Sequence, residues 1–178
     1  MKNITHALAI LLSLFAFPAI AQAQSTQIRT EYLMTIVVPT ERKSIDPTLT
    51  IVNVLPGGTF KGPAIQGKII APSGDWLHSM PSGTLRQEAK LTLETNDGAF
   101  IYMSYVGVVA MSKEAGETLA RGEIVTDKSV PYFINTPLFQ TSSEKYSWLN
   151  KVQTVGKMVE LKRTPTEAYV KYDIFVIR

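Results

Sequence analysis

The segment of residues 85–95 constrains the fold more than any other part of this 178-residue chain, because its side chains alternate between apolar and polar. The apolar face carries Ala89, Leu91 and Leu93, and the polar face carries Glu88, Lys90, Thr92 and Glu94. A period of two residues is the pattern of a half-buried strand. Asn96-Asp97-Gly98 follows directly and tolerates the positive φ angles of a hairpin turn, so residues 99–109 are the predicted return strand.

Similar strand patterns recur along the chain and are separated by short turns rich in glycine and proline. They cover residues 31–38, 48–55, 59–70, 132–140, 152–161 and 168–177, with turns predicted at 40–47, 72–75 and 81–83. One short helix is predicted at residues 113–121, closed by Gly122. We therefore predict an all-β fold: a single closed antiparallel β-barrel of about eight strands with one short helix. A sandwich is the alternative, but closure removes the exposed strand edges that an open sheet must protect.

The amino terminus has the pattern of a secretory signal peptide. Lys2 precedes an uncharged apolar stretch at residues 7–19, and small residues then satisfy the cleavage rule as Ala19-Ile20-Ala21 or Ala21-Gln22-Ala23. We predict cleavage after Ala23, a polar leader at 24–30 and a β-barrel domain at 31–178. A membrane anchor needs roughly 20 apolar residues, so this shorter stretch predicts a periplasmic or secreted protein with no membrane span after cleavage.

The composition excludes several classes of function. The chain has no cysteine, which removes disulfides, thiol catalysis and thiolate metal sites. His78 is the only histidine beyond the predicted signal, so we expect no metal site, and we predict no cofactor. The formal net charge is only +3, and no run of like charges occurs, so no nucleic-acid partner is expected. The oligomeric state is left open.

Four segments together resemble a known family. They are GGTFKGP at residues 57–63, GDW at 74–76, TNDGAFIY at 95–102 and YFINTPLFQTSSEKYSWLN at 132–150. In this order they resemble domain-of-unknown-function family 3237, a UPF0311-like group. The resemblance implies a closed β-barrel of the allene-oxide-cyclase or lipocalin-like kind with a small-molecule pocket. Some fungal relatives are regarded as cofactor-independent cyclases. The family's glycine-rich motif usually has an acid where this chain has Lys61, and Glu88-Ala89-Lys90-Leu91 replaces a family Asp-Ala-Arg-Tyr.

Three ionisable residues in these segments are the candidate catalytic groups, namely Glu88, Asp75 and Lys61. A buried carboxylate or lysine with a shifted pKa can act as a general acid or base. Each also has a structural interpretation: Asp75 as a turn residue, Lys61 as a surface cation, and Glu88 as a solvent-facing residue of its strand. Asp97 is interpreted as a turn residue, and His78, between two predicted turns, is expected at the surface.

The candidate ligand-binding residues are mostly aromatic, and they have a core-packing interpretation as well. They are Phe60, Trp76, Lys90, Tyr102, Tyr132, Phe133 and Trp148. The leading functional hypothesis is a barrel that binds a small apolar or aromatic molecule in its interior. The alternatives are a cofactor-independent cyclase, isomerase or lyase, and a structural or interaction module without a ligand, which an exposed apolar patch would favour.

Overall fold

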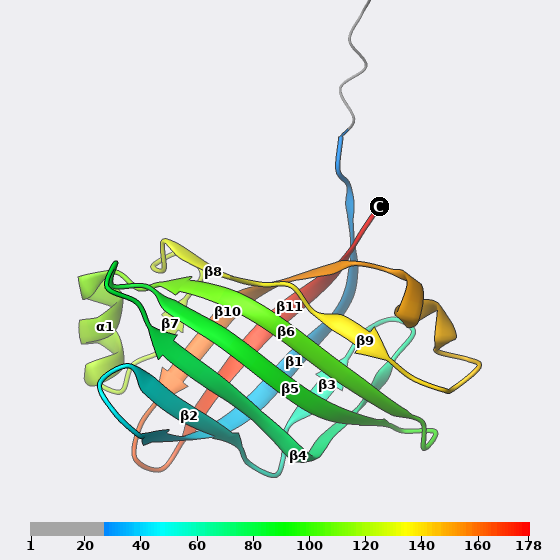
Figure 1. Ribbon diagram of the computed structural model, residues 1–178, viewed down its shortest axis with the longest axis horizontal. Helices are drawn as coiled ribbons and strands as arrows, with labels where there is room; N and C mark the ends of the chain where they lie inside the picture. Colours follow the sequence, from blue (N-terminus) through cyan, green and yellow to red (C-terminus); the bar gives the residue numbers. More distant parts are fainter. Residues whose placement is uncertain (1–26) are drawn as a thin grey trace, which may run out of the picture.

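The computed structural model describes residues 27–178 and shows a curved antiparallel sheet with a short helix at one end (Figure 1). The predicted signal peptide and its cleavage site lie outside the described residues. The strands are β1 (Thr30–Ser44), β2 (Leu49–Val54), β3 (Thr59–Lys61), β4 (Gln66–Ser79), β5 (Leu85–Thr95), β6 (Phe100–Ala110), β7 (Val125–Thr126), β8 (Tyr132–Asn135), β9 (Leu138–Gln140), β10 (Thr154–Arg163) and β11 (Ala168–Ile177). The helices are α1 (Lys113–Ala120) and the short 3₁₀ helix η1 (Ser147–Lys151).

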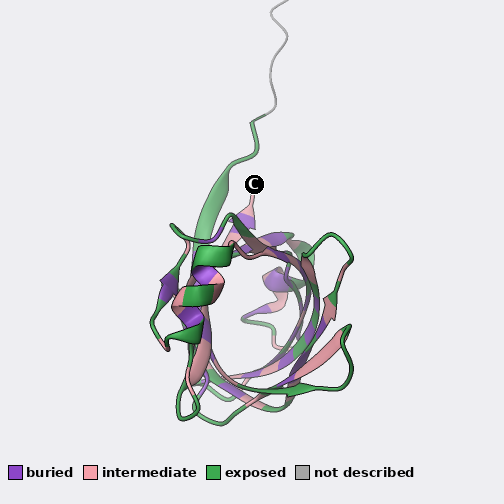
Figure 2. Ribbon diagram, turned by 90° about the vertical axis from the view of Figure 1, so that its left-hand side faces the viewer, coloured by how far each residue is buried: buried purple, intermediate pink, exposed green. Residues whose placement is uncertain are grey.

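Eight strands follow one another in a ring of antiparallel pairings. The order is β11, β1, β2, β4, β5, β6, β8 and β10, and β10 pairs again with β11. The sheet curls around to a barrel-like shape, and α1 lies across part of one end (Figure 2). Among residues 27–178, the predicted all-β, antiparallel architecture with one α-helix is confirmed. No helix in this range is long and apolar enough to cross a membrane.

Two proline-containing segments were predicted as turns and are strands instead. β1 continues through Pro39 to Ser44, because residues 40–44 leave β11 and pair with β2. Pro39 has no N–H to donate, but its carbonyl accepts a hydrogen bond from the Leu55 N–H at 2.9 Å. Residues 71–73 form a bulge within β4, since Ile70 pairs with Thr92 and Gly74 pairs with Lys90. The turn predicted at 72–75 is therefore wrong, and Asp75 lies within a strand.

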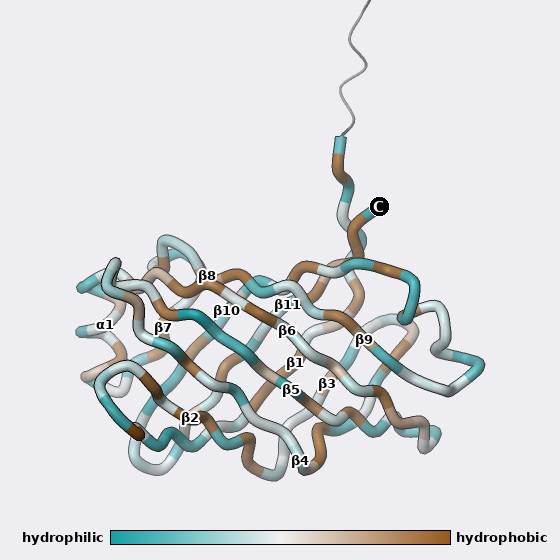
Figure 3. The backbone as a smooth tube through the Cα atoms, viewed as in Figure 1, coloured by the Kyte–Doolittle hydropathy of each residue, from teal (hydrophilic) through white to brown (hydrophobic). Residues whose placement is uncertain are grey.

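The apolar residues that point inward pack into one core cluster inside the ring, and Ala115 and Leu119 of α1 belong to it. Along β5 every second side chain is buried, beginning with Gln87 and continuing with Ala89, Leu91 and Leu93. Met34, Ile36, Phe60, Ile101, Met103, Leu149, Met158 and Ile174 are almost fully buried in the same cluster. Hydrophobic and hydrophilic residues are interspersed along most strands, as their two faces require (Figure 3).

Two glycines, Gly62 after β3 and Gly67 in β4, lie close to the backbone of neighbouring segments. A Cβ atom at Gly62 would lie 1.9 Å from the Leu33 carbonyl oxygen. A Cβ atom at Gly67 would lie 2.1 Å from the Glu94 carbonyl oxygen and 2.6 Å from Cζ of Phe60. Both contacts are far shorter than van der Waals separation, and backbone atoms cannot move aside as a flexible side chain can.

Replacement of Gly67 by alanine should therefore destabilise the fold. We expect G67A to lower the free energy of unfolding by more than about 2 kcal/mol, because the added methyl group forces β4 away from β5. Gly116, in α1, is the matched control, since nothing lies within 4 Å of a Cβ atom there. G116A should be neutral or stabilising by up to about 1 kcal/mol, as alanine favours helix. Urea unfolding of the three proteins measures both effects, and equal stability of G67A and wild type would contradict the close contact.

Candidate functional site

A cavity of about 220 Å³ occupies the half of the ring nearer α1. Its wall is made mainly of apolar side chains from strands β1, β2, β4, β5, β6, β8, β10 and β11 and from α1. They are Val38, Val52, Val54, Leu77, Leu85, Leu91, Val109, Met111, Leu119, Phe133, Leu161 and Val170. An apolar cavity of about 150 Å³ is large enough for benzene. The space here therefore suits an aromatic molecule somewhat larger than a single ring.

A buried polar cluster interrupts this apolar wall. Asp75 of β4 and Gln87 of β5 are only 7% and 5% exposed. The Gln87 side-chain amide donates to Oδ2 of Asp75 at 2.9 Å and to the Tyr172 hydroxyl at 3.2 Å. Oδ1 of Asp75 and Oε1 of Gln87 are buried without a hydrogen-bond partner in the described part of the chain. Both oxygens have almost no surface that water can reach, and an unpaired buried polar atom of this kind costs free energy.

Burial has a strong effect on the acidity of this cluster. Removal from water raises the pKa of Asp75 to about 6, although hydrogen bonds from Gln87 and the backbone, and the positive charge of Arg42, act in the opposite direction. Burial also raises the pKa of Tyr105 and Tyr172 well above the usual value for tyrosine. Both phenols are thus neutral near pH 7, whereas Asp75 can exchange a proton in that range.

Aromatic rings surround Tyr172 on two sides. The ring of Tyr105 meets it edge to face, with centroids 6.2 Å apart, and the ring of Phe133 does so at 5.6 Å. These contacts hold the rings in place, as edge-to-face pairs do. Tyr105, Phe133 and Tyr172 all line the cavity, so a planar guest would find aromatic faces or edges there.

Two of the ten predicted site residues, Asp75 and Phe133, are at this cavity. Glu88 and Lys90 are on the outer face of β5, where they form an exposed ion pair at 3.1 Å. The pleat explains this placement, because neighbours of the inward-pointing Gln87, Ala89 and Leu91 must point outward. The interpretation of Glu88 and Lys90 as solvent-facing residues is therefore the one that the structure supports.

The other predicted residues are also outside the cavity. Lys61, Tyr102 and Tyr132 are exposed, and Trp76 lies on the outer face with the Lys90 ammonium 5.6 Å from its ring. Phe60 is part of the filled core, and Trp148 packs against that core from η1. His78 is half-buried and borders a shallow outer hollow together with Arg86.

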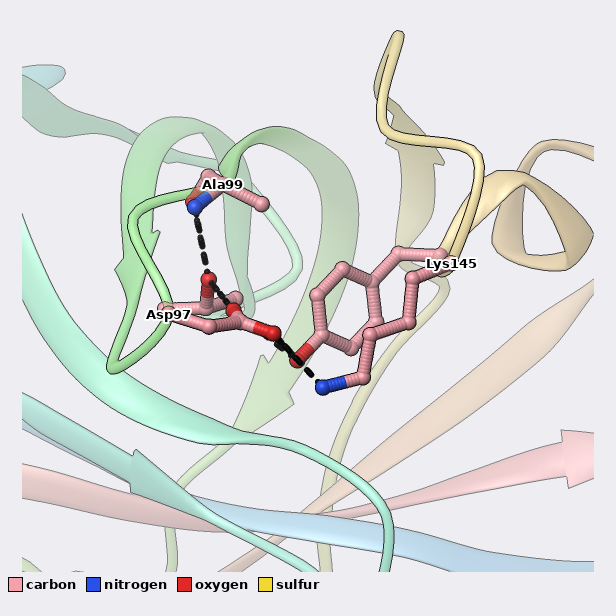
Figure 4. Close-up of polar contacts among 5 residues, drawn as sticks. Asp97, Ala99 and Lys145 are labelled. Atoms are coloured by element: carbon pink, nitrogen blue, oxygen red, sulfur yellow. Dashed lines mark hydrogen bonds and ion pairs between the residues drawn. The ribbon is translucent and has the colours of Figure 1, made fainter.

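Asp97 has the turn role that the sequence predicted. Its carboxylate accepts hydrogen bonds from the Thr95 hydroxyl at 2.5 Å, the Lys145 ammonium at 2.6 Å and the Tyr146 hydroxyl at 3.1 Å (Figure 4). These contacts, Lys145 first, lower the pKa of Asp97 to about 2. They connect the β5–β6 turn to the segment before η1, and both carboxylate oxygens of Asp97 have hydrogen-bond partners within the protein. Asp97 is therefore a structural acid.

Sequence reasoning missed most of the residues that line the cavity. The sequence analysis does not name Gln87, Tyr105 or Tyr172. Gln87 could have been identified, because it is a polar residue on the otherwise apolar face of β5. Arg42 and Arg163 also line the cavity. Arg42 lies in the turn predicted at 40–47, and Arg163 lies beyond the strand predicted at 152–161, so no strand pattern pointed to them. No group of three or more His, Cys, Asp or Glu side chains within residues 27–178 is arranged to hold a metal ion.

Known proteins with similar sequences or folds share this architecture. A UPF0311 protein of Rhodopseudomonas palustris is 37% identical over 100 residues, which span 56% of this chain and 65% of the relative. The aligned segment is thus less than two thirds of that relative's length. The crystal structure of a conserved protein of unknown function from R. palustris covers 86% of this chain and 99% of its own, with a TM-score of 0.75 and 29% identity.

Two further similarities bear on the fold and the chemistry. A β-barrel-like protein of Acinetobacter baumannii is 31% identical and covers 88% of this chain and all of its own, with a TM-score of 0.67. A hydroalkoxylation enzyme of Penicillium herquei is 32% identical over 113 residues, spanning 62% of this chain and 58% of the enzyme. The model of the family described as protein of unknown function (DUF3237) matches residues 28–177, nearly the whole described range. The chain therefore belongs to the DUF3237 family.

Proposed function

We propose that the ring of strands is a closed barrel that binds a small, mainly apolar molecule in the cavity beside Asp75. The observation that carries the proposal is the 220 Å³ cavity itself, whose apolar wall is interrupted by the polar residues Asp75 and Gln87. Small-molecule sites commonly combine an apolar wall with a few polar groups that fix the orientation of the ligand. Residues of α1 line this cavity, so the guest would lie beside that helix.

A larger side chain in the cavity should weaken this binding. Val109 is buried on β6 and lines the cavity, whereas Val106 on the same strand is 62% exposed on the outer wall. We expect V109F to weaken the binding of 2-naphthol by at least about tenfold, because the larger ring occupies the space of the guest. V106F should bind as wild type does. Amide chemical-shift titration by NMR measures both, and binding of 2-naphthol with no shifts at the cavity strands would refute the location.

A second candidate function, proton transfer without a cofactor, is favoured by the environment of Asp75. A carboxyl group with a pKa of about 6 can both donate and accept a proton near neutral pH, as general acid–base catalysis requires. The similar enzyme of P. herquei is named for hydroalkoxylation. Such a reaction adds an O–H group across a carbon–carbon double bond. One proton is given to carbon and one is lost from oxygen, and no electrons are gained or lost. Asp75 could supply the first and take up the second.

The raised pKa of Asp75 predicts how stability depends on pH. Below about pH 4 the carboxyl is protonated in both the folded and the unfolded chain and has no effect. Between about pH 4 and pH 6 it ionises only in the unfolded chain, so stability is lost as the pH rises, and above pH 6 the loss is constant. A shift of this size is worth roughly 3 kcal/mol. We therefore expect D75N to be increasingly more stable than wild type up to about pH 6, as measured by urea unfolding.

Asp97 provides the control of opposite sign. Its lowered pKa means that its ionised form stabilises the folded protein above about pH 4, and that this stabilisation is lost as the pH falls towards 2. D97N should therefore be less stable than wild type near pH 7, and the difference in their free energies of unfolding should shrink as the pH falls towards 2. A difference between D75N and wild type that does not change with pH would count against the buried, proton-exchanging carboxyl.

We also propose export, with cleavage after Ala23 by signal peptidase. The support is the sequence pattern alone, a charged start, an apolar stretch and small residues at the cleavage site. Protein recovered from the periplasm or medium of the producing cells should begin at Gln24 when its intact mass is measured. A mass that includes residues 1–23 in the exported protein would overturn this proposal, and it would leave the cavity unaffected.

A further inference from the structure

The mouth of the cavity carries two arginine side chains. Arg42 of β1 and Arg163 of β10 line the cavity, and together with Thr40 they also line an adjoining outer hollow near residues 164–168. These residues therefore lie between the two spaces. The strands β1 and β10 are not neighbours in the ring, since β11 lies between them, so the fold brings these two cations together across the end of the sheet.

No acid neutralises either guanidinium at short range. Among the ion pairs of residues 27–178, neither Arg42 nor Arg163 takes part. Burial and the like charge of Arg163 lower the pKa of Arg42, while Asp75 partly compensates. The like charges of the two guanidinium groups thus oppose each other.

Within the described residues, the acidic residues near Arg42 and Arg163 do not form ion pairs with them. Glu41 and Glu167 line only the outer hollow, and the Lys162 ammonium lies 2.5 Å from the Glu167 carboxylate. Asp75 lies in the cavity but is not in an ion pair with Arg42 within the described chain, and it is largely protonated below pH 6. An anion between Arg42 and Arg163 would remove their repulsion and gain charge-assisted hydrogen bonds from two planar donors, which suit a carboxylate.

We propose that the ligand is an amphipathic anion, with an aromatic or other apolar body in the cavity and a carboxylate or similar anionic oxygen group held between Arg42 and Arg163 at the mouth. This inference rests on the proposed binding function and adds the chemical class of the ligand. The size of the cavity limits the body to about two fused rings, since a cavity of about 150 Å³ already accepts benzene. The anionic end faces solvent, and the opposite end lies towards the Asp75–Gln87–Tyr172 cluster.

The test compares two ligands of nearly equal shape, 2-naphthoate and its neutral amide, 2-naphthamide. At pH 5, where Asp75 is largely protonated, we expect the wild-type chain to bind the acid about tenfold more tightly than the amide. R42Q and R163Q should each weaken binding of the acid about threefold and leave binding of the amide unchanged, and the double variant should bind the two equally. Added salt should weaken the binding of 2-naphthoate and leave the binding of 2-naphthamide unchanged. Isothermal titration calorimetry gives all these constants.

Arg86 on β5 supplies the matched control, because it borders an outer hollow away from the cavity. R86Q removes the same charge and should keep the full preference for the acid. If wild type binds acid and amide equally, or if the double variant keeps the preference, the anion site is overturned while the cavity proposal stands. If neither compound binds the folded protein at millimolar concentration, both proposals fail together.

Discussion

The alternation of side chains along each strand of the ring is the constraint on which the rest of the structure depends. A pleated strand can send only every second residue inward. Eight strands paired in a ring therefore enclose a fixed number of inward positions, and their volumes decide how much of the interior is filled. Large residues such as Met34, Phe60 and Met158 are almost fully buried in the core. In the half nearer α1, the inward positions carry several valines, and about 220 Å³ remains open.

The polar cluster of Asp75, Gln87 and Tyr172 lies in the open half, and this placement gives the cavity its chemistry. A carboxyl group inside an apolar wall loses hydration, and the hydrogen bond from Gln87 restores only part of it, so its pKa rises to about 6. The same carboxyl type at the surface, in Asp97, is held by Lys145 and has its pKa lowered to about 2. Environment alone thus separates an acid that exchanges protons near neutral pH from one that ties a turn to its neighbouring segment.

The cavity is lined by groups of different charge, and this bears on ligand orientation. Neutral phenols and an amide lie around Asp75, while Arg42 and Arg163 also border the adjoining outer hollow. An apolar guest with one anionic group can satisfy both environments in only one direction. A fixed orientation would present a chosen atom of the guest to Asp75, and orientation of this kind is a large part of what a protein contributes to catalysis without a cofactor.

The sequence alone determined the local elements whose patterns are short-range. Residues 85–95 were predicted as a strand and are β5, and the helix predicted at 113–121 is α1 at Lys113–Ala120. Strand β1 beyond Pro39 and the bulge at 71–73 were missed, because they depend on partners distant in the chain. The tertiary structure decided which face of β5 is inside. It also decided that Asp75, Tyr105, Tyr172, Arg42 and Arg163, from five different strands, share one cavity. Periodicity separates two faces of a strand, but only the closing of long-range pairings brings faces from distant strands together.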